Sequence, residues 1–240
     1  MKKQLISVSD IIKQGWHLYI ENLQLFLLPV IIMLVIPGSI LILEYFQYYN
    51  LLLYVLIIAI SIFISLWVSI YIIKIIDNLY NKKPVLTNEL LRISFHKIPG
   101  YFWVSFLAGL VILFGLILII IPGIIFAVWF EFAPYINILE EKNNKGLPAL
   151  KQSKLLVKGN FWTTLWRLMA PAIFVYIIVM IIVAALTYLI TGGNIDLVDP
   201  YSQANMVLNG LSTIILTLLA PLFISFIIIL YNSLKQAKKS

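Results

Sequence analysis

Six long runs of apolar residues constrain the fold of this 240-residue chain more than any other feature. Each run is close to the ~20 residues that an α-helix needs to cross the hydrocarbon core of a bilayer. Hydrophobic residues make up 62% of the chain and charged residues 11%, which leaves few residues for a separate soluble domain. The sequence therefore predicts an all-α integral membrane protein whose single polytopic domain covers residues 1–240. The predicted spans cover approximately residues 23–43, 51–76, 101–121, 122–139, 163–190 and 206–231.

The 17 Lys and Arg residues predict how the chain is oriented. In a six-span arrangement all of them fall on the side that holds both termini, whereas the opposite loops contain only Glu44, Asp196 and Asp199. Basic residues beside membrane helices are enriched on the cytoplasmic side. We therefore expect a multi-pass protein of the cell (plasma) membrane with both termini in the cytoplasm. Its net charge of +7 requires no nucleic-acid partner, since these lysines can face anionic lipid headgroups instead.

Three amphipathic surface helices are predicted on the cytoplasmic side, ahead of the first, third and fifth spans. The first follows a helix cap at Ser9 or Asp10, the second covers about residues 86–98, and the third lies within residues 140–162. A Gly or Asn residue, at Asn22, Gly100 and Gly159, is expected to end each surface helix before the span begins. The third copy has the clearest interfacial motif where the chain enters the bilayer, formed by Ser153, Lys158, Gly159, Asn160 and Trp162.

The recurrence of a surface helix followed by a helical hairpin suggests three parallel repeats, over residues 9–80, 86–140 and 147–234. All three copies would enter the membrane from the same side, unlike the inverted repeats of many transporters. The alternative, that any cytoplasmic helix leading into a span converges on this pattern, stays open.

Two segments carry a resemblance to a known group of proteins. PGIIFAVWFEFAPY at residues 122–135 and GLPALKQSKLLVKGNFW at residues 146–162 together resemble a bacterial six-span membrane-domain superfamily. That superfamily includes the membrane region of glycerophosphoryl diester phosphodiesterases and related uncharacterised integral membrane proteins. In those phosphodiesterases a separate soluble barrel carries the chemistry. The resemblance therefore implies an architecture and transfers no catalytic residue.

Glu131 is the sharpest candidate for a functional residue inside the membrane. It lies eight positions after Gly123, about 12 Å into the bilayer along a helix, where a carboxylate must be protonated, paired or solvated. Two interpretations are open: a proton or substrate site between helices, or a protonated carboxyl that hydrogen-bonds a neighbouring helix. Pro134 and Asn137 follow on the same helix, which Pro134 should loosen, and Pro122 with Gly123 should form the preceding helix turn.

Catalytic, metal and cofactor sites are not predicted. The chain has no cysteine, its two histidines, His17 and His96, fall on separate surface helices, and Asp196 and Asp199 lack the alternating oxygen ligands of a calcium loop. The common nucleophile, nucleotide and zinc motifs are also missing. We therefore expect neither an enzyme nor a cofactor.

Two functions fit these observations. The first is a non-enzymatic, lipid-interacting scaffold or accessory subunit of the cell envelope, whose basic helices bind anionic headgroups or an unknown protein partner. The alternative is a small transporter or permease-like carrier for a lipid or amphiphile, with a cavity near Glu131.

Overall fold

Helices form nearly all of the described part of the chain. The computed structural model describes residues 5–45, 50–140, 146–192 and 203–239, and no β-strand occurs in these ranges. The helices are α1 (Val8–Glu21), α2 (Leu23–Tyr45), α3 (Leu51–Tyr80), α4 (Thr87–Leu118), α5 (Ile120–Phe130), α6 (Ala133–Leu139), α7 (Leu147–Val157), α8 (Phe161–Thr191) and α9 (Gln203–Lys239). In the described residues six helical stretches are long and apolar enough to cross a membrane, one each in α2, α3, α4, α5 with α6, α8 and α9. The predicted all-α class with six spans is confirmed.

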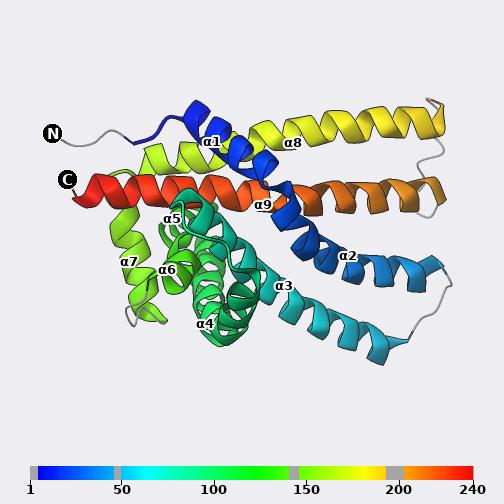
Figure 1. Cartoon of the computed structure of the whole chain (residues 1–240), viewed down its shortest axis with the longest axis horizontal. Helices are drawn as coiled ribbons and strands as arrows, with labels where there is room; N and C mark the ends of the chain where they lie inside the picture. Colours follow the sequence, from blue (N-terminus) through cyan, green and yellow to red (C-terminus); the bar gives the residue numbers. More distant parts are fainter. Residues whose placement is uncertain (1–4, 46–49, 141–145, 193–202, 240) are drawn as a thin grey trace.

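The long helices form three hairpins, α2 with α3, α4 with α5 and α6, and α8 with α9 (Figure 1). The hairpins are packed together at the end of the molecule where both chain termini lie (Figure 1). From there α2 with α3 and α8 with α9 diverge toward the opposite end, whereas α4, α5 and α6 are seen nearly end-on (Figure 1). The short helices α1 and α7 lie at the packed end, and both contact α9. The N-terminal segment is held there by Arg167 of α8, whose guanidinium donates to the backbone carbonyls of Leu5 and Ile6.

The core lies at the packed end, around the second half of α9. Helix α9 contacts α1, α2, α3 and α8. The ring of Tyr231 on α9 also lies against the ring of Phe132, the residue before α6. Within a membrane, helices associate mainly through close van der Waals packing, which requires matched side chains. Fully buried Ile and Leu residues of this core include Ile11, Ile70, Ile72, Ile75, Ile76, Ile136, Ile138, Leu222, Ile228, Ile229, Leu230 and Leu234.

The opposite ends of the hairpins expose large apolar side chains. Leu51 at the start of α3 is 82% exposed, Ile117 near the end of α4 is 72% exposed, and Leu189 near the end of α8 is 75% exposed. Isolated soluble proteins rarely expose so much contiguous apolar surface. These surfaces suit contact with lipid chains, as expected of membrane spans.

The N-cap of helix α1 lies two residues before Ser9, the first of the two predicted caps. Ser7 is the N-cap residue, and its hydroxyl accepts from the backbone N–H of Asp10 at 3.1 Å. Asp10 is inside the first turn, where its carboxylate accepts a hydrogen bond from the Ser7 hydroxyl. The residues that α1 buries are Ile11, Gly15 and Tyr19, spaced four apart along one face. A Cβ atom on Gly15 would meet the Phe226 ring at 2.5 Å, so this glycine permits the close approach of α1 and α9.

The break predicted at Gly100 is wrong. Helix α4 continues from the predicted surface helix into the span, through Pro99 and Gly100. Gly100 instead lies against α6, because a Cβ atom there would be 3.2 Å from the Asn137 side-chain oxygen. A Cβ atom here would press on the Asn137 side chain, so Gly100 favours close packing of α4 on α6, a role that looks the same in the sequence as a turn.

The turn between the third and fourth spans lies at Ile119 rather than at Pro122 and Gly123. Ile119 has an extended backbone, and α5 starts at the next residue. Pro122 stands in the first turn of α5, where a missing N–H leaves no helical hydrogen bond unmade. A Cβ atom on Gly123 would meet the Leu116 side chain at 2.3 Å, so Gly123 allows α4 and α5 to pack closely.

The chain does turn between α7 and α8. Gly159 has φ +87°, in the left-handed region that glycine adopts most easily, and α8 begins two residues later at Phe161. Asn160 is the N-cap residue of α8, and its backbone carbonyl accepts from the Thr163 hydroxyl at 2.8 Å.

Candidate functional site

The two segments of the sequence resemblance meet in the structure, where α7 packs on α5. Helix α5 ends at Phe130, and the last carbonyls of a helix have no partner within it. The buried hydroxyl of Ser153 on α7 donates to one of them, the Trp129 carbonyl, at 2.6 Å. The next residue, Lys154, places its ammonium 4.1 Å from the centroid of the Trp129 ring. The two segments thus form one helix-to-helix contact.

Glu131 lies at the break between α5 and α6. The fourth span is not one helix, because α5 ends before Glu131 and α6 begins after it, with Pro134 in the first turn of α6. Pro134 therefore starts a helix instead of loosening one, the position that its fixed φ favours. Glu131 is partly buried, and the phenols of Tyr101 and Tyr135 lie within electrostatic reach of its carboxylate.

Asn137 lies one turn further along α6, partly buried against Gly100 of α4. Nearby, the ammonium group of Lys97 on α4 donates to the Ile138 carbonyl of α6 at 2.6 Å. These contacts join the second predicted surface segment to the end of the fourth span.

Three spans return to the packed end, and each carries two aliphatic residues followed by a polar one near its end. The polar residues are Asp77 of α3, Glu140 directly after α6, and Tyr231 of α9, preceded by Ile-Ile, Ile-Leu and Ile-Leu. The Tyr231 hydroxyl donates to Glu140 Oε1 at 2.8 Å, and Asp77 is close enough to Tyr231 to interact with it electrostatically. The structure thus brings equivalent ends of three hairpins to one place.

Glu140 is the centre of a polar network. Besides Tyr231, it is bound by the Lys235 ammonium, with Nζ 3.0 Å from Oε1, and by the side-chain amide of Gln152 on α7. Burial alone would raise the pKa of Glu140, but the hydrogen bonds from Lys235, Tyr231 and Gln152 outweigh it and hold the pKa below its usual range. The carboxylate is therefore charged at neutral pH and links α6, α7 and α9.

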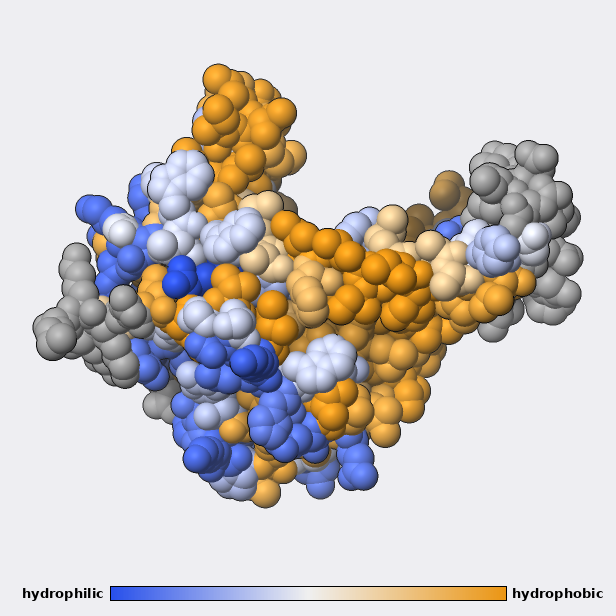
Figure 2. Space-filling model, turned by 90° about the horizontal axis from the view of Figure 1, so that it is seen from above, coloured by the Kyte–Doolittle hydropathy of each residue, from blue (hydrophilic) through white to orange (hydrophobic). Residues whose placement is uncertain are grey.

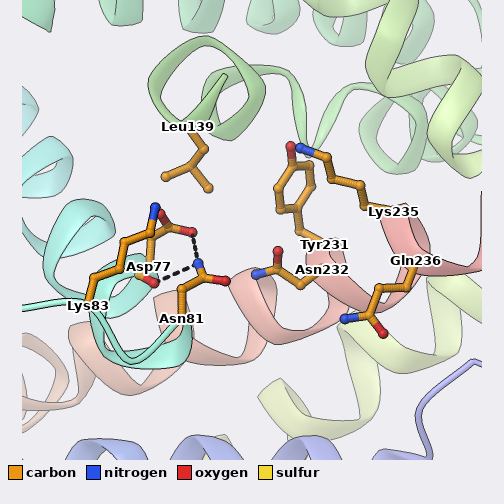
Figure 3. Close-up of a pocket in the computed structure, with 8 residues that line it drawn as sticks. All are labelled: Asp77, Asn81, Lys83, Leu139, Tyr231, Asn232, Lys235 and Gln236. Carbon is orange, nitrogen blue, oxygen red and sulfur yellow. Dashed lines mark hydrogen bonds between the residues drawn. The ribbon is translucent and has the colours of Figure 1, made fainter. Parts of the chain in front are cut away.

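Two cavities flank this network and share Tyr231 and Lys235 in their linings. The first, of about 300 Å³, lies between the ends of α3, α6 and α9 (Figure 3). Asp77, Asn81 and Lys83 line one side, and Tyr231, Asn232 and Lys235 line the other. The second, of about 240 Å³, lies between α6, α7 and α9 and is lined by Glu140, Gln152 and Lys238 among others. Glu131 lines neither of these two cavities.

The sequence analysis did not single out Asp77, Glu140 or Tyr231. A usable signal was present, because two acids stand at the ends of apolar runs on a side otherwise rich in lysine. Recognising Tyr231 as the third member requires aligning the ends of the returning spans rather than the beginnings of the entering ones. Contact among the three residues still depends on how the hairpins pack.

The other predicted site residues lie on the surface near α7 and α8. Lys158 ends α7, and its backbone carbonyl accepts from the Lys238 ammonium at 2.8 Å. Trp162 is exposed in the first turn of α8. His17 and His96 are exposed on α1 and α4. Within the described ranges, no group of three or more His, Cys, Asp or Glu side chains could hold a metal ion. Asp196 and Asp199 lie outside the described residues.

Comparison with known proteins supports the membrane assignment. The chain is similar to a UPF0259 membrane protein of Sodalis glossinidius (strain morsitans), with 30% identity over 166 residues, 69% of this chain. The chain is a multi-pass membrane protein. The match covers 60% of that relative's length, so the chain spans about three fifths of it. No family model matches the chain, and no solved structure matches it either. The relative's name describes a membrane protein and no activity, consistent with the uncharacterised bacterial membrane proteins expected from the sequence.

Proposed function

We propose that this chain is a non-enzymatic membrane protein of the cell envelope that binds anionic lipid headgroups at its packed end and acts as a scaffold or accessory subunit. Both termini lie in the cytoplasm in this proposal, and the packed end meets the cytoplasmic leaflet of the plasma membrane.

The observation that carries the proposal is the distribution of charge. Hydrophilic residues gather toward the end of the molecule where the termini lie, while apolar side chains cover the spread hairpins (Figure 2). Two exposed lysines belong to that end: Lys151 on α7 and Lys158, the residue that caps its C-terminus. Lysines held beside a leaflet of anionic lipids contribute about 1 kcal/mol each to binding. Helices α1 and α7 are the short helices that would lie in the interface.

The likeness to the membrane region of glycerophosphoryl diester phosphodiesterases belongs to this proposal as an architecture. The contact between Ser153 and Trp129 supports it, because the two segments that carry the likeness depend on one another in the fold. We also propose the three parallel repeats, with the Gly100 break removed. Their support is the equivalent placement of Asp77, Glu140 and Tyr231 near the ends of the returning spans.

The proposal is tested by measuring which lipids surround the purified full-length chain. The wild type, placed in nanodiscs of mixed phosphatidylglycerol and phosphatidylcholine, is expected to enrich the anionic lipid. In the double variant Lys151→Gln with Lys158→Gln, the enrichment should fall about fivefold for each charge removed.

The matched control is the double variant Lys151→Arg with Lys158→Arg, which keeps both charges and should retain the enrichment. Because both side chains are exposed, neither pair of substitutions should alter folding. Equal enrichment in the Gln and Arg variants would contradict the proposal.

A further inference from the structure

The cavity of about 300 Å³ between the ends of α3, α6 and α9 is lined by both an acidic residue, Asp77, and basic residues, Lys83 and Lys235. Its volume is at the lower limit for ligand sites and suits a small polar group rather than a whole lipid. Leu139 is the apolar residue of the lining, and the other lining residues are polar or charged (Figure 3).

The acceptor groups of the cavity come from both of its sides: Asp77 and Asn81 from the end of α3, and Asn232 from α9 (Figure 3). The Asn81 side-chain nitrogen donates to the Asp77 carboxylate at 2.9 Å and to the Asp77 backbone carbonyl at 2.8 Å. The side-chain nitrogen of Asn232 donates to the Ile228 carbonyl at 3.0 Å. Two hydrogen bonds engage the Asn81 nitrogen and one engages the Asn232 nitrogen, so the two amides offer a ligand their side-chain oxygens and one N–H of Asn232. Asn81 and Asn232 point toward one another across the cavity (Figure 3).

The cationic groups also come from both sides: Lys83 follows α3 and lies beside Asp77, and Lys235 of α9 lies beside Tyr231 (Figure 3). Both lie close enough to Asp77 to interact with it electrostatically, as does Lys74. Glu140 binds Lys235, but one ammonium group has three N–H donors, so Lys235 can serve another acceptor as well. A ligand with only negative charge would face Asp77 and Glu140, and one with only positive charge would face the lysines.

We propose that this cavity binds a zwitterionic group in which a phosphoester is joined by a short linker to a primary ammonium, as in the headgroup of an aminophospholipid. The phosphate lies against Lys83 and Lys235, and the ammonium lies against Asp77 and the amide oxygens of Asn81 and Asn232. Such a group satisfies both signs of charge at once. The position of the cavity near the ends of three spans is the depth at which headgroups lie.

This inference rests on the proposed function only in placing the packed end at a leaflet. The surface lysines Lys151 and Lys158 do not line the cavity. Their Gln variants should change enrichment of anionic lipid and leave the cavity's selectivity as it is, so the two proposals can fail separately.

The test compares phosphatidylethanolamine with phosphatidylcholine of the same acyl chains, titrated into the full-length chain in detergent and followed by native mass spectrometry. The trimethylammonium of phosphatidylcholine has no N–H to donate, so the wild type should bind phosphatidylethanolamine about tenfold more tightly. Equal affinity for the two lipids would overturn the proposal.

Two variants separate the contribution of the acid from that of the lysine. Asp77→Asn should abolish the preference for the primary ammonium, whereas Lys83→Gln should weaken both lipids to the same degree and keep the preference. Glu89→Gln, an exposed acid on α4, is the control that should change neither. A preference unchanged by Asp77→Asn in a folded variant would overturn the proposal. If Asp77→Asn does not fold, the Lys83→Gln variant provides the test. Unchanged binding of both lipids by Lys83→Gln would also overturn the proposal.

Free phosphoethanolamine is added as a competitor to distinguish a lipid from a soluble ligand. With a lipid as the source, a large excess should be needed to displace phosphatidylethanolamine. Displacement at a comparable concentration would support the same chemistry and assign the ligand to the soluble pool.

Discussion

Glu131 illustrates how a single polar residue inside a span is tied to its neighbours. It stands between two short helices, and its carboxyl interacts electrostatically with the phenols of Tyr101 and Tyr135. A carboxyl at this depth is stable when it is neutral and hydrogen-bonded. Glu131 is absent from the lining of both cavities described at the packed end.

We expect Glu131→Gln to fold with wild-type thermal stability, since an amide can take the place of a neutral carboxyl. Glu131→Ala should lose about 1 to 3 kcal/mol by leaving polar neighbours unpaired. Thermal unfolding in detergent measures both variants. Loss of a cellular phenotype in the well-folded Gln variant would instead favour the proton or substrate site of the transporter hypothesis, whereas an unaltered phenotype in both variants would remove it.

Glu140 should make the stability of the chain depend on pH on the acid side. Its pKa is lower in the folded chain than in the unfolded chain, so its contribution is fully present above the unfolded pKa of about 4.3 and is lost as the pH falls through the folded pKa. At pH 7, Glu140→Gln should cost about 1 to 2 kcal/mol. The difference in melting temperature between the wild type and this variant should therefore shrink from pH 7 to pH 3.

The control for this pH dependence is Glu89→Gln, at an exposed site in the first turn of α4. It should give a small difference at every pH. A Glu140→Gln difference that stays constant between pH 7 and pH 3 would show that the carboxylate charge is not what stabilises the network.

At the scale of the elements, short helix α7 depends on the break in the fourth span. Helix α5 leaves the Trp129 carbonyl available because it ends at Phe130, and Ser153 occupies that carbonyl. The position of α7 then brings Gln152 to Glu140. A break in one helix thus determines where another docks.

Ser153→Ala should destabilise the chain by about 1 to 3 kcal/mol, because it leaves a carbonyl without its partner at a buried contact. The matched control is Ser94→Ala on α4. Ser94 is as buried as Ser153, but its hydroxyl donates within its own helix, to the Leu90 carbonyl at 2.7 Å. Removing it should cost less, since that carbonyl also belongs to the helical backbone ladder. Equal losses in the two variants would argue against a docking role for Ser153.

At the scale of the whole molecule, the packed end and the spread ends of the hairpins differ in charge and burial. The packed end holds the termini and the hydrophilic surface, and the spread ends expose apolar side chains (Figures 1 and 2). This polarity, together with the basic residues in the sequence, underlies the proposed orientation.

Because the chain has no cysteine, single cysteines can report that orientation without background. We expect Asn50→Cys, at the exposed start of α3, to react with a membrane-impermeant maleimide in intact bacterial cells. Lys158→Cys, at the end of α7, should react only after the inner membrane is permeabilised. The reverse pattern would invert the proposed topology, and labelling of both sites in intact cells would refute a cytoplasmic packed end.

The sequence by itself determined the features that depend on local composition. Apolar runs of sufficient length predict six helical spans, because hydrocarbon offers no hydrogen-bond partners and the backbone N–H and C=O groups must therefore pair with one another. The turn at Gly159 could also be predicted from the sequence, because a left-handed backbone conformation depends mainly on the residue itself and its chain neighbours. Gly100 and Gly123 were misjudged because a glycine needed for close packing cannot be told from one needed for a turn until the partner helix is known.

Only the tertiary structure decided the site. Asp77, Glu140 and Tyr231 are 63 and 91 residues apart along the chain, and no local pattern requires them to meet. They meet because each of the three returning spans ends at the packed end of the molecule (Figure 1), where α9 packs against α3 and the Tyr231 hydroxyl reaches Glu140. Depth follows from the length of each apolar run, but which helices are neighbours depends on side-chain fit between segments distant in sequence.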